Sequence, residues 1–360
     1  MRIGTLILNN FKNFEHWQAS FHPQVNVLVG PNGRGKTNIL DAIYMLAMGK
    51  SYFSLTHRQL IRHGEHFFSL RGLFEKENTQ WDVLIKYREG ERKILSVNGK
   101  ETERLSDHIG RIPVVMISPY DRDLIGEGGE TRRKFLDKLI SQYDAAYLAD
   151  LIRYHRTLQQ RNSLLKFFAA NGLFDPARLE PFDLALAETG TRIYEKRKEL
   201  TAKINPLLKE KYRWISGGAE QVDIRYKSAL DKMPLLEILR KNLERDRVLQ
   251  YTGSGIHRDD LEFLIDDYPI RKFGSQGQQK SFLVALRLAQ SDLLFMRKND
   301  TPILLFDDAF DKLDPRRVQQ ILRYVKERMQ GQVFITDTHE ERTGQLLEVL
   351  ENQGKIIALS

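Results

Sequence analysis

A glycine-rich segment near the N-terminus carries the residue types that bind phosphate. It reads Gly30-Pro31-Asn32-Gly33-Arg34-Gly35-Lys36-Thr37, follows the apolar run 25–29 and precedes a helical pattern over 38–48. Glycines at these positions let successive backbone N–H groups point at one anion. Lys36 would reach the β- and γ-phosphates of a nucleotide, and the Thr37 hydroxyl would bind Mg²⁺. The segment therefore predicts a P-loop nucleotide site.

Two carboxylates follow a second apolar run, residues 303–306. A P-loop site needs a carboxylate at the end of a neighbouring buried strand to hold the metal, and Asp307 is expected to do this. Asp308 is expected to orient or deprotonate the attacking water, because phosphoryl transfer leaves the protein mainly positioning and electrostatic work.

A third segment, residues 274–280, precedes a long helical pattern and has the sequence Gly-Ser-Gln-Gly-Gln-Gln-Lys. Ser275 can cap that helix, and the glycines permit close approach of the backbone to a phosphate. Alone, the segment predicts only a helix cap. Its place in the chain, between the P-loop and the acidic strand, indicates that it has a role beyond capping the helix.

Elements of two kinds must position these residues. Short apolar runs bounded by turn residues predict strands over 4–8, 25–29, 81–87, 94–97, 112–117, 303–306 and 333–336, with a hairpin turn at Asn98-Gly99. Helical periodicity without Gly or Pro predicts one long helix or two over 131–166, and the pattern recurs over 181–208. Further helices are expected over 278–296 and 316–329. The flanks are therefore α/β, and the middle is a helical hairpin or bundle.

Composition restricts the class of protein. The chain has 360 residues and a net charge of +8, and it has no cysteine, which excludes disulfides, thiolate nucleophiles and Cys-ligated metals. No apolar run approaches the roughly 20 residues that cross a bilayer, and no signal peptide is recognisable, so we expect a cytoplasmic protein without a membrane partner. Residues 125–249 carry 24 basic against 18 acidic side chains, so most of the positive excess lies in the helical middle.

The order of these motifs resembles the heads of ABC-type ATPases, and within them the RecF family of bacterial replication and repair proteins. The resemblance is carried by blocks at 6–17, 30–53, 118–137, 253–263, 275–280 and 304–314. It implies an α/β fold: an ABC-type P-loop ATPase head with a mixed sheet, formed by 1–124 and 250–360, plus an inserted all-helical arm, 125–249. The chain departs from the family pattern at Ile256, at Tyr120 and over 309–312.

The resemblance also implies a mechanism. ATP and Mg²⁺ would be the cofactors, and Ser275, Gly277 and Gln278 of one subunit would complete the nucleotide site of another, giving an ATP-dependent homodimer. Weak, DNA-stimulated ATP hydrolysis would serve as a switch. The protein would bind single-stranded, duplex or gapped DNA at the nucleoid and would help the mediators RecO and RecR to load recombinase in recombinational repair and replication restart.

A DNA clamp of this kind grips phosphates through Lys and Arg. The candidates on the arm are Arg132, Arg133, Lys134, Arg153, Arg156 and Arg161. Their helical spacing also suits an ordinary solvated face.

Several alternatives remain open. A transporter ATPase subunit would carry the same nucleotide motifs but would normally lack so large a basic helical insertion. An SMC-like clamp with negligible turnover would differ only in hydrolysis, and a metabolic P-loop kinase is disfavoured by the segment at Ser275. Either Asp337 or His339 could sense the γ-phosphate, while His63 and His66 are expected to be loop residues.

Overall fold

The computed structural model describes residues 1–54, 56–76, 79–218, 220–311, 313–328, 331–337 and 354–359. The chain divides into two units. Unit 1 consists of Met1–Asp121, Lys211–Ala219 and Ser275–Ser360, and unit 2 consists of Arg122–Glu210 and Glu220–Gly274. This division differs from the expected head and arm chiefly at residues 250–274, which fall in unit 2 rather than with the head.

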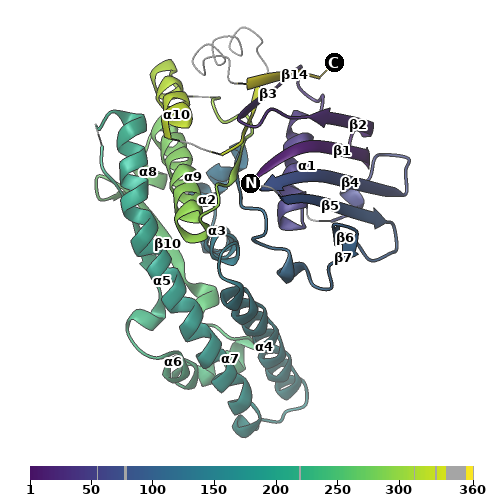
Figure 1. Ribbon diagram of the computed structural model, residues 1–360. Helices are drawn as coiled ribbons and strands as arrows, with labels where there is room; N and C mark the ends of the chain where they lie inside the picture. Colours follow the sequence, from purple (N-terminus) through teal and green to yellow (C-terminus); the bar gives the residue numbers. More distant parts are fainter. Residues whose placement is uncertain are drawn as a thin grey trace. The chain divides into compact units, whose positions relative to one another are not determined.

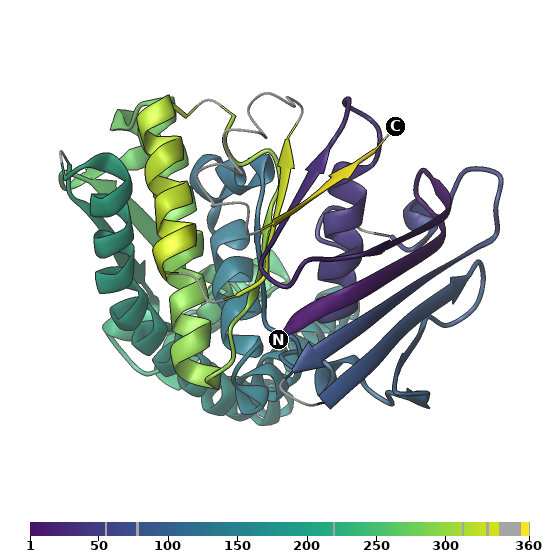
Figure 2. The same ribbon diagram turned by 45° about the horizontal axis from the view of Figure 1, so that its top comes forward.

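A five-stranded parallel sheet carries the P-loop of unit 1 (Figure 2). Its order is β14 (Gly354–Ala358), β3 (Val25–Val29), β13 (Val333–Asp337), β12 (Ile303–Phe306) and β8 (Val114–Ile117). The four strands β3, β13, β12 and β8 are buried at every residue, as expected for a parallel sheet that is covered on both faces. All five strands end at the same edge, which is where polar side chains can converge.

The second sheet of unit 1 is antiparallel and has six strands. Its order is β2 (Phe14–Ser20), β1 (Arg2–Phe11), β4 (Phe67–Lys76), β5 (Thr79–Arg88), β6 (Ile94–Val97) and β7 (Lys100–Glu101). The predicted hairpin turn joins β6 to β7, and Asn98 and Gly99 both have positive φ, 52° and 77°. These angles match a type I′ turn, which explains why the Asn-Gly pair is placed there.

Helix α1 (Lys36–Met48) lies between the two sheets (Figure 2). Eleven of its thirteen residues are buried, so the helix has no apolar stripe but is apolar almost all round. Ile39, Ile43 and Leu46 belong to one hydrophobic core with side chains of both sheets, among them Leu70 and Leu305. The P-loop therefore leads into the most enclosed helix of unit 1.

Helices α9 (Gln276–Lys298) and α10 (Pro315–Arg328) complete unit 1, together with the last turns of α5 (Glu180–Ser216). The Lys211 ammonium lies 2.6 Å from the Asp292 carboxylate on α9, and Trp214 Nε1 donates to the Gln320 carbonyl on α10 at 3.0 Å. The C-terminal end of α5 is thus held by both helices.

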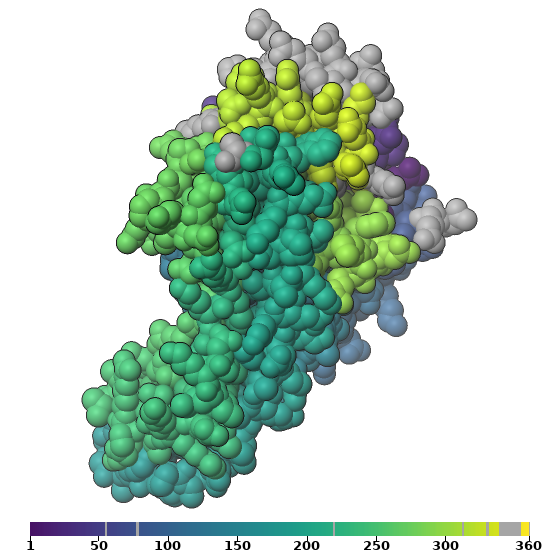
Figure 3. All heavy atoms as spheres, turned by 90° about the vertical axis from the view of Figure 1, so that its left-hand side faces the viewer, coloured from purple at the N-terminus to yellow at the C-terminus, as the bar shows by residue number. Residues whose placement is uncertain are grey.

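Unit 2 is dominated by helices (Figure 1). They are α2 (Arg122–Gly126), α3 (Gly129–Ser141), α4 (Ala145–Ala170), most of α5, α6 (Leu235–Lys241), α7 (Leu243–Leu249) and α8 (Ile270–Phe273). The helical pattern over 131–166 forms two helices, because Asp144 caps α4 by accepting the Tyr147 N–H at 2.9 Å. Helix α5 runs 37 residues with Pro206 inside it, and its exposed side forms the long teal surface in Figure 3.

A three-stranded antiparallel sheet accompanies these helices and was not predicted. Its order is β11 (Tyr268–Pro269), β10 (Asp260–Ile265) and β9 (Val222–Lys227). Strand β9 lies in the segment that was expected to be all helical. Its pairing with β10, from Asp260↔Lys227 to Ile265↔Val222, is the physical reason that residues after 250 join unit 2.

Buried ion pairs connect the helices of unit 2. Arg161 on α4 is fully buried, and its guanidinium donates to Asp183 on α5 at 2.6 Å and to Asp246 on α7 at 2.7 Å. Arg197 on α5 is 1% exposed and bonds the Asp137 carboxylate on α3 at 2.8 Å. Charges so deeply buried are tolerated only when they are paired, so each pair fixes which helix faces meet.

Among the described residues, no helix combines the length and hydropathy required to span a bilayer.

Replacing Arg161 by Met should destabilise the protein strongly, because Asp183 and Asp246 would remain buried without their partner. We expect the free energy of unfolding to fall by about 3–5 kcal/mol, measured by urea denaturation of the full chain. The matched control is Arg153→Met on the same helix, whose exposed side chain lies 3.4 Å from Glu188; its loss should cost about 1 kcal/mol or less. Equal effects of the two substitutions would show that the Arg161 pairs do not hold unit 2 together.

Candidate nucleotide-binding site

The P-loop joins the end of β3 to the start of α1. Gly30, Gly33 and Gly35 have φ values of 154°, 84° and 97°, a region that side-chain-bearing residues rarely adopt. A Cβ on Gly35 would also lie 2.5 Å from the Phe14 ring, so both conformation and space demand glycine there. Residues Pro31 to Arg34 are exposed, whereas Gly35 and Lys36 are buried. The loop thus has an open rim over an enclosed base.

The Lys36 side chain folds back into this loop. It is 5% exposed, and its ammonium donates to the backbone carbonyls of Gly30 and, at 3.0 Å, Pro31. The positive charge is therefore already held within the turn formed by the loop, where the P-loop pattern requires a phosphate-binding cation.

The residues proposed to hold the metal lie next to each other. Thr37 Oγ1 donates to the Asp307 carboxylate at 2.8 Å, although the two residues are 270 positions apart. Thr336, the penultimate residue of β13, donates to the same carboxylate at 3.2 Å. The N-terminus of α1 and the ends of β12 and β13 therefore supply one hydroxyl–carboxylate–hydroxyl cluster.

Burial of Asp307 changes its acidity. The side chain lies in a nearly closed environment, and desolvation raises the pKa of its carboxyl to about 6, with a further increase from the neighbouring Asp308 charge. The hydrogen bond from Thr37 acts in the opposite direction but is the smaller effect. Because burial disfavours the negative charge of Asp307, a bound cation that neutralises this charge would be favourable there.

Asp308 has an unusual backbone conformation for a non-glycine residue, with φ of 43°. Its N–H donates to Thr336 Oγ1 at 2.9 Å, which helps to hold this geometry. Burial raises the pKa of its half-buried carboxyl, while Lys36 and Lys280 lower it. A strained residue with a raised pKa beside a phosphate loop fits the expected role of positioning water.

The segment at Ser275 forms the N-terminus of α9. The Ser275 hydroxyl accepts the Gln278 N–H at 3.3 Å, and the Gln278 side chain accepts the Ser275 N–H at 2.7 Å, which is a capping box. Ser275 and Gln276 are exposed, and Gly277 is half-buried. The predicted cap is confirmed, and the helix N-terminus is accessible from solvent.

Two features of this region were missed from sequence. Thr336 ends the predicted strand 333–336, and its contact with Asp307 has no signal in the sequence. Arg287 on α9 is buried and bonds the Asp121 carboxylate at 2.6 Å and the Tyr52 hydroxyl at 3.0 Å, linking three distant segments. An arginine on the apolar face of a helical pattern was the available signal for this cluster.

The donor set fits a nucleotide with Mg²⁺. No group of three or more His, Cys, Asp or Glu that could hold a metal occurs in the part of the chain that the structure describes. Thr37 and Asp307 offer two oxygen ligands, which suits Mg²⁺ because this ion usually keeps several waters and takes its remaining ligands from phosphates. Of the two candidates for sensing the γ-phosphate, Asp337 is buried at the end of β13, and His339 lies outside the described residues.

The predicted DNA contacts are in different environments. Arg161 is buried in the ion pairs described above, so burial removes it from the set of phosphate contacts. Arg132 pairs with Asp260 at 2.7 Å, and Arg133 donates to the Asp259 carbonyl at 2.6 Å. The other three side chains are exposed: Lys134, Arg153 and Arg156.

Comparisons with known proteins agree with this architecture. The family model described as RecF/RecN/SMC N terminal domain matches residues 2–355. The DNA replication and repair protein RecF of Flavobacterium johnsoniae is 49% identical, with 100% of each chain covered. That of Azobacteroides pseudotrichonymphae is 43% identical over 100% of this chain and 98% of its own length.

Solved structures of RecF and of an Smc head are also similar to this chain. The recombination mediator protein RecF-ATP in the RecFOR pathway superposes with a TM-score of 0.86 at 33% identity, covering 94% of this chain and 92% of that chain. An Smc head bound to the C-terminal winged-helix domain of ScpA has a TM-score of 0.59 at 16% identity, covering 99% and 93%, and supports the fold alone.

Removing the Asp307 charge should stabilise the protein when neither nucleotide nor metal is bound. The pKa of about 6 in the fold lies above the roughly 4 of an unfolded chain, so the folded state holds the proton more tightly and the ionised carboxylate is destabilising at neutral pH. In metal-free buffer, Asp307→Asn should raise the free energy of unfolding by roughly 1–3 kcal/mol at about pH 8.

This difference should shrink as the pH falls through 6 towards 4, where the wild-type carboxyl is protonated in the fold as well. The exposed Asp311→Asn variant serves as the control and should follow wild type throughout. A stability difference for Asp307→Asn that does not vary with pH would contradict the assigned acidity.

Proposed function

The chain belongs to the RecF family and has the ABC-type P-loop ATPase fold predicted from its sequence, and we propose that it is an ATP-switched DNA-binding protein of recombinational repair and replication restart. The observation that carries the proposal is the hydrogen bond from Thr37 to Asp307 beside the glycine loop that holds Lys36. These groups can bind one triphosphate and one divalent cation together.

ATP would be bound by the loop Gly30–Thr37. Backbone N–H groups of the loop and the N-terminus of α1 would face the phosphates, and the Lys36 ammonium would exchange its two loop carbonyls for phosphate oxygens. Thr37 and Asp307 would hold Mg²⁺, which neutralises phosphate charge when bound. The bound cation would then compensate the negative charge of Asp307, which burial makes unfavourable.

Slow hydrolysis would depend on Asp308. Its carboxyl follows the metal ligand directly, and burial raises its pKa, which makes it a stronger proton acceptor than an ordinary carboxylate. The backbone bond to Thr336 fixes the residue relative to the three strand ends.

A second copy of the chain would complete each site. Ser275, Gly277 and Gln278 lie at the exposed N-terminus of a 23-residue helix, whose dipole favours an anion. We propose that this segment meets the γ-phosphate held by Lys36 of the partner. ATP would thereby close a homodimer, and hydrolysis would open it.

The closed dimer would bind the phosphate groups of DNA. The exposed residues Lys134, Arg153 and Arg156 are the proposed contacts on the arm, with Arg132 and Arg133 as secondary ones because their side chains are only partly exposed. Single-stranded, duplex and gapped DNA are all candidate ligands. RecO and RecR are the proposed mediator partners, since the related solved structure belongs to the RecFOR pathway.

Replacing Lys36 by Ala should weaken ATP binding by about 100-fold or more, because charge-assisted hydrogen bonds to phosphate are lost. Binding of a fluorescent ATP analogue or calorimetry with ATP would measure this. Lys166→Ala, an exposed lysine on α4, should bind ATP as wild type does. Wild-type affinity in the Lys36 variant would refute the loop assignment, provided that its thermal melt shows the chain to be folded.

Ser275→Arg should bind ATP but fail to dimerise, since a bulky cation would occupy the place of the partner's γ-phosphate. Light scattering with ATP and Mg²⁺ gives the oligomeric state. Ser275→Ala separates this effect from loss of the helix cap, which costs about 1 kcal/mol but leaves the surface open; it should still dimerise. ATP-dependent dimers of Ser275→Arg would show that the site is not composite.

A further inference from the structure

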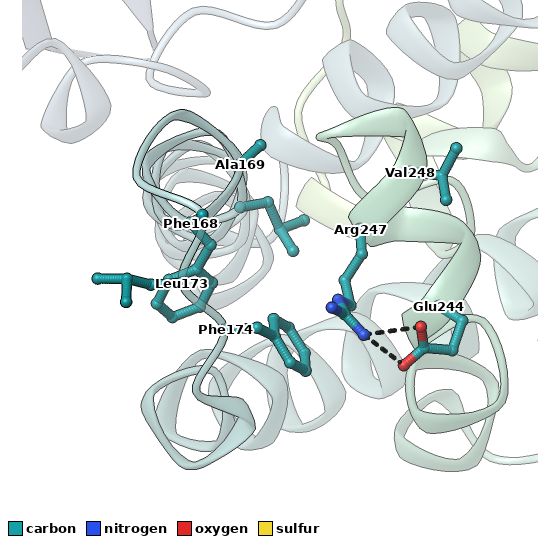
Figure 4. A pocket seen from close by; sticks show the side chains of 9 residues that line it. Phe168, Ala169, Leu173, Phe174, Glu244, Arg247 and Val248 are labelled. Atoms are coloured by element: carbon teal, nitrogen blue, oxygen red, sulfur yellow. Dashed lines mark hydrogen bonds and ion pairs between the residues drawn. The ribbon is translucent and has the colours of Figure 1, made fainter.

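A pocket of about 380 Å³ in unit 2 is unrelated to the nucleotide site. It lies between the C-terminal end of α4, the loop that follows it, and α7, as Figure 4 shows. Its lining residues, which define the α4–α7 pocket, are Leu165, Phe168, Ala169, Gly172, Leu173, Phe174, Glu244, Arg247 and Val248. A volume of this size holds one or two large side chains of a partner.

One side of the α4–α7 pocket is apolar and open to solvent. Leu165 and Phe168 are buried in a small hydrophobic cluster at its base. Leu173 and Val248 at its rim are 59% and 83% exposed, and the adjacent Phe167 is 48% exposed. Large apolar side chains gathered around a hollow are typical of a binding surface, whereas single ones are not.

The α7 wall of the pocket also carries a cation, next to Val248 in the sequence. The Arg247 guanidinium lies 3.7 Å from the centre of the Phe174 ring and donates to both carboxylate oxygens of Glu244, at 3.0 and 2.8 Å (Figure 4). The Glu244 side chain is 78% exposed, and exposed pairs contribute only about 0–1 kcal/mol. A carboxylate of a ligand can therefore take the place of Glu244 on Arg247 at little cost.

The pocket is formed in advance. Asp246, between two exposed arginines of α7, points inward to Arg161 at 2.7 Å and accepts the Gly253 N–H at 2.9 Å. Arg161 is held in turn by Asp183 and by Thr252 Oγ1 at 2.8 Å. These bonds fix the face of α7 that bears Arg247 and Val248, so a ligand would not have to order it.

The surrounding charge selects the ligand. The exposed charged side chains of α6 and α7 are four basic and two acidic ones: Arg240, Lys241, Arg245, Arg247, Glu237 and Glu244. This excess of positive charge attracts an acidic segment and disfavours a second copy of the same face. The exposed Leu173 and Val248 favour a protein side chain over the phosphate backbone of DNA.

We propose that the α4–α7 pocket docks an acidic amphipathic helix of a partner protein. Apolar side chains one turn apart on that helix would enter between Leu173 and Val248, and a neighbouring carboxylate would bind Arg247. This is the helix-in-groove mode of recognition, with anchors at i and i+3 or i+4. The interaction requires neither ATP nor DNA.

The test uses the full-length protein and a fluorescein-labelled peptide of about 16 residues with Leu at i, i+4 and i+7 and Glu at the exposed positions. Fluorescence anisotropy should detect binding of this peptide and not of a version with every Glu changed to Lys. The double variant Leu173→Ser and Val248→Ser should weaken binding by about tenfold or more. Ile152→Ser, which removes an equally exposed apolar side chain elsewhere on α4, should leave it unchanged.

A second variant tests the cation. Arg247→Glu should abolish the preference for the acidic peptide, and Arg247→Lys should retain most of it. The proposal is overturned if the acidic peptide does not bind, if the double serine variant binds it as wild type does, or if the basic peptide binds equally well. It is also overturned if the serine variant loses affinity for a single-stranded oligonucleotide and not for the peptide.

Discussion

The hydrogen bond between Thr37 and Asp307 is the contact on which the nucleotide site depends. It exists because β3, β13 and β12 are neighbours in one parallel sheet and end at the same edge, with Val27 opposite Ile335 and Leu305 opposite Phe334. These strands are buried on both faces, so a slip of one residue would turn every side chain from one packed layer into the other. Helix α1, enclosed between two sheets, fixes Thr37 from the other side. The packing of the core thus determines where Thr37 and Asp307 meet.

Much of this site could be predicted from sequence because its signals are local. The loop from Gly30 to Thr37 and the strand ending at Asp307 each specify their own conformation, and strand β3 and strand β12 have the predicted bounds. Thr336 and Arg287 could not be found in this way. Their roles arise from which strands and helices become neighbours in three dimensions: an arginine on an apolar helix face indicates a buried partner but does not identify Asp121 or Tyr52, and a single threonine gives no signal at all.

The helical middle shows the same limit. Periodicity predicted its long helices, but the break at Asp144 depends on one side-chain cap and could not be placed. Strand β9 is short and finds its partner β10 more than thirty residues later in the chain, so only pairing makes it visible. Charge was equally ambiguous: Arg161 and Arg153 lie on the same helix, yet one is buried among carboxylates and the other faces solvent. Counting arginines cannot distinguish a structural ion pair from a ligand contact.

The positive charge of the chain therefore divides into two parts, one that holds unit 2 together and one that is available to a partner. In the proposed function, ATP controls the access of DNA to the available part. The most direct measurement is the affinity of the wild-type protein for a gapped duplex with ATP and with ADP, each across a range of salt concentrations. Binding should be at least about tenfold tighter with ATP and should depend more steeply on salt, because more phosphates are neutralised in the closed state. Equal affinity and equal salt dependence with the two nucleotides would contradict the proposed function.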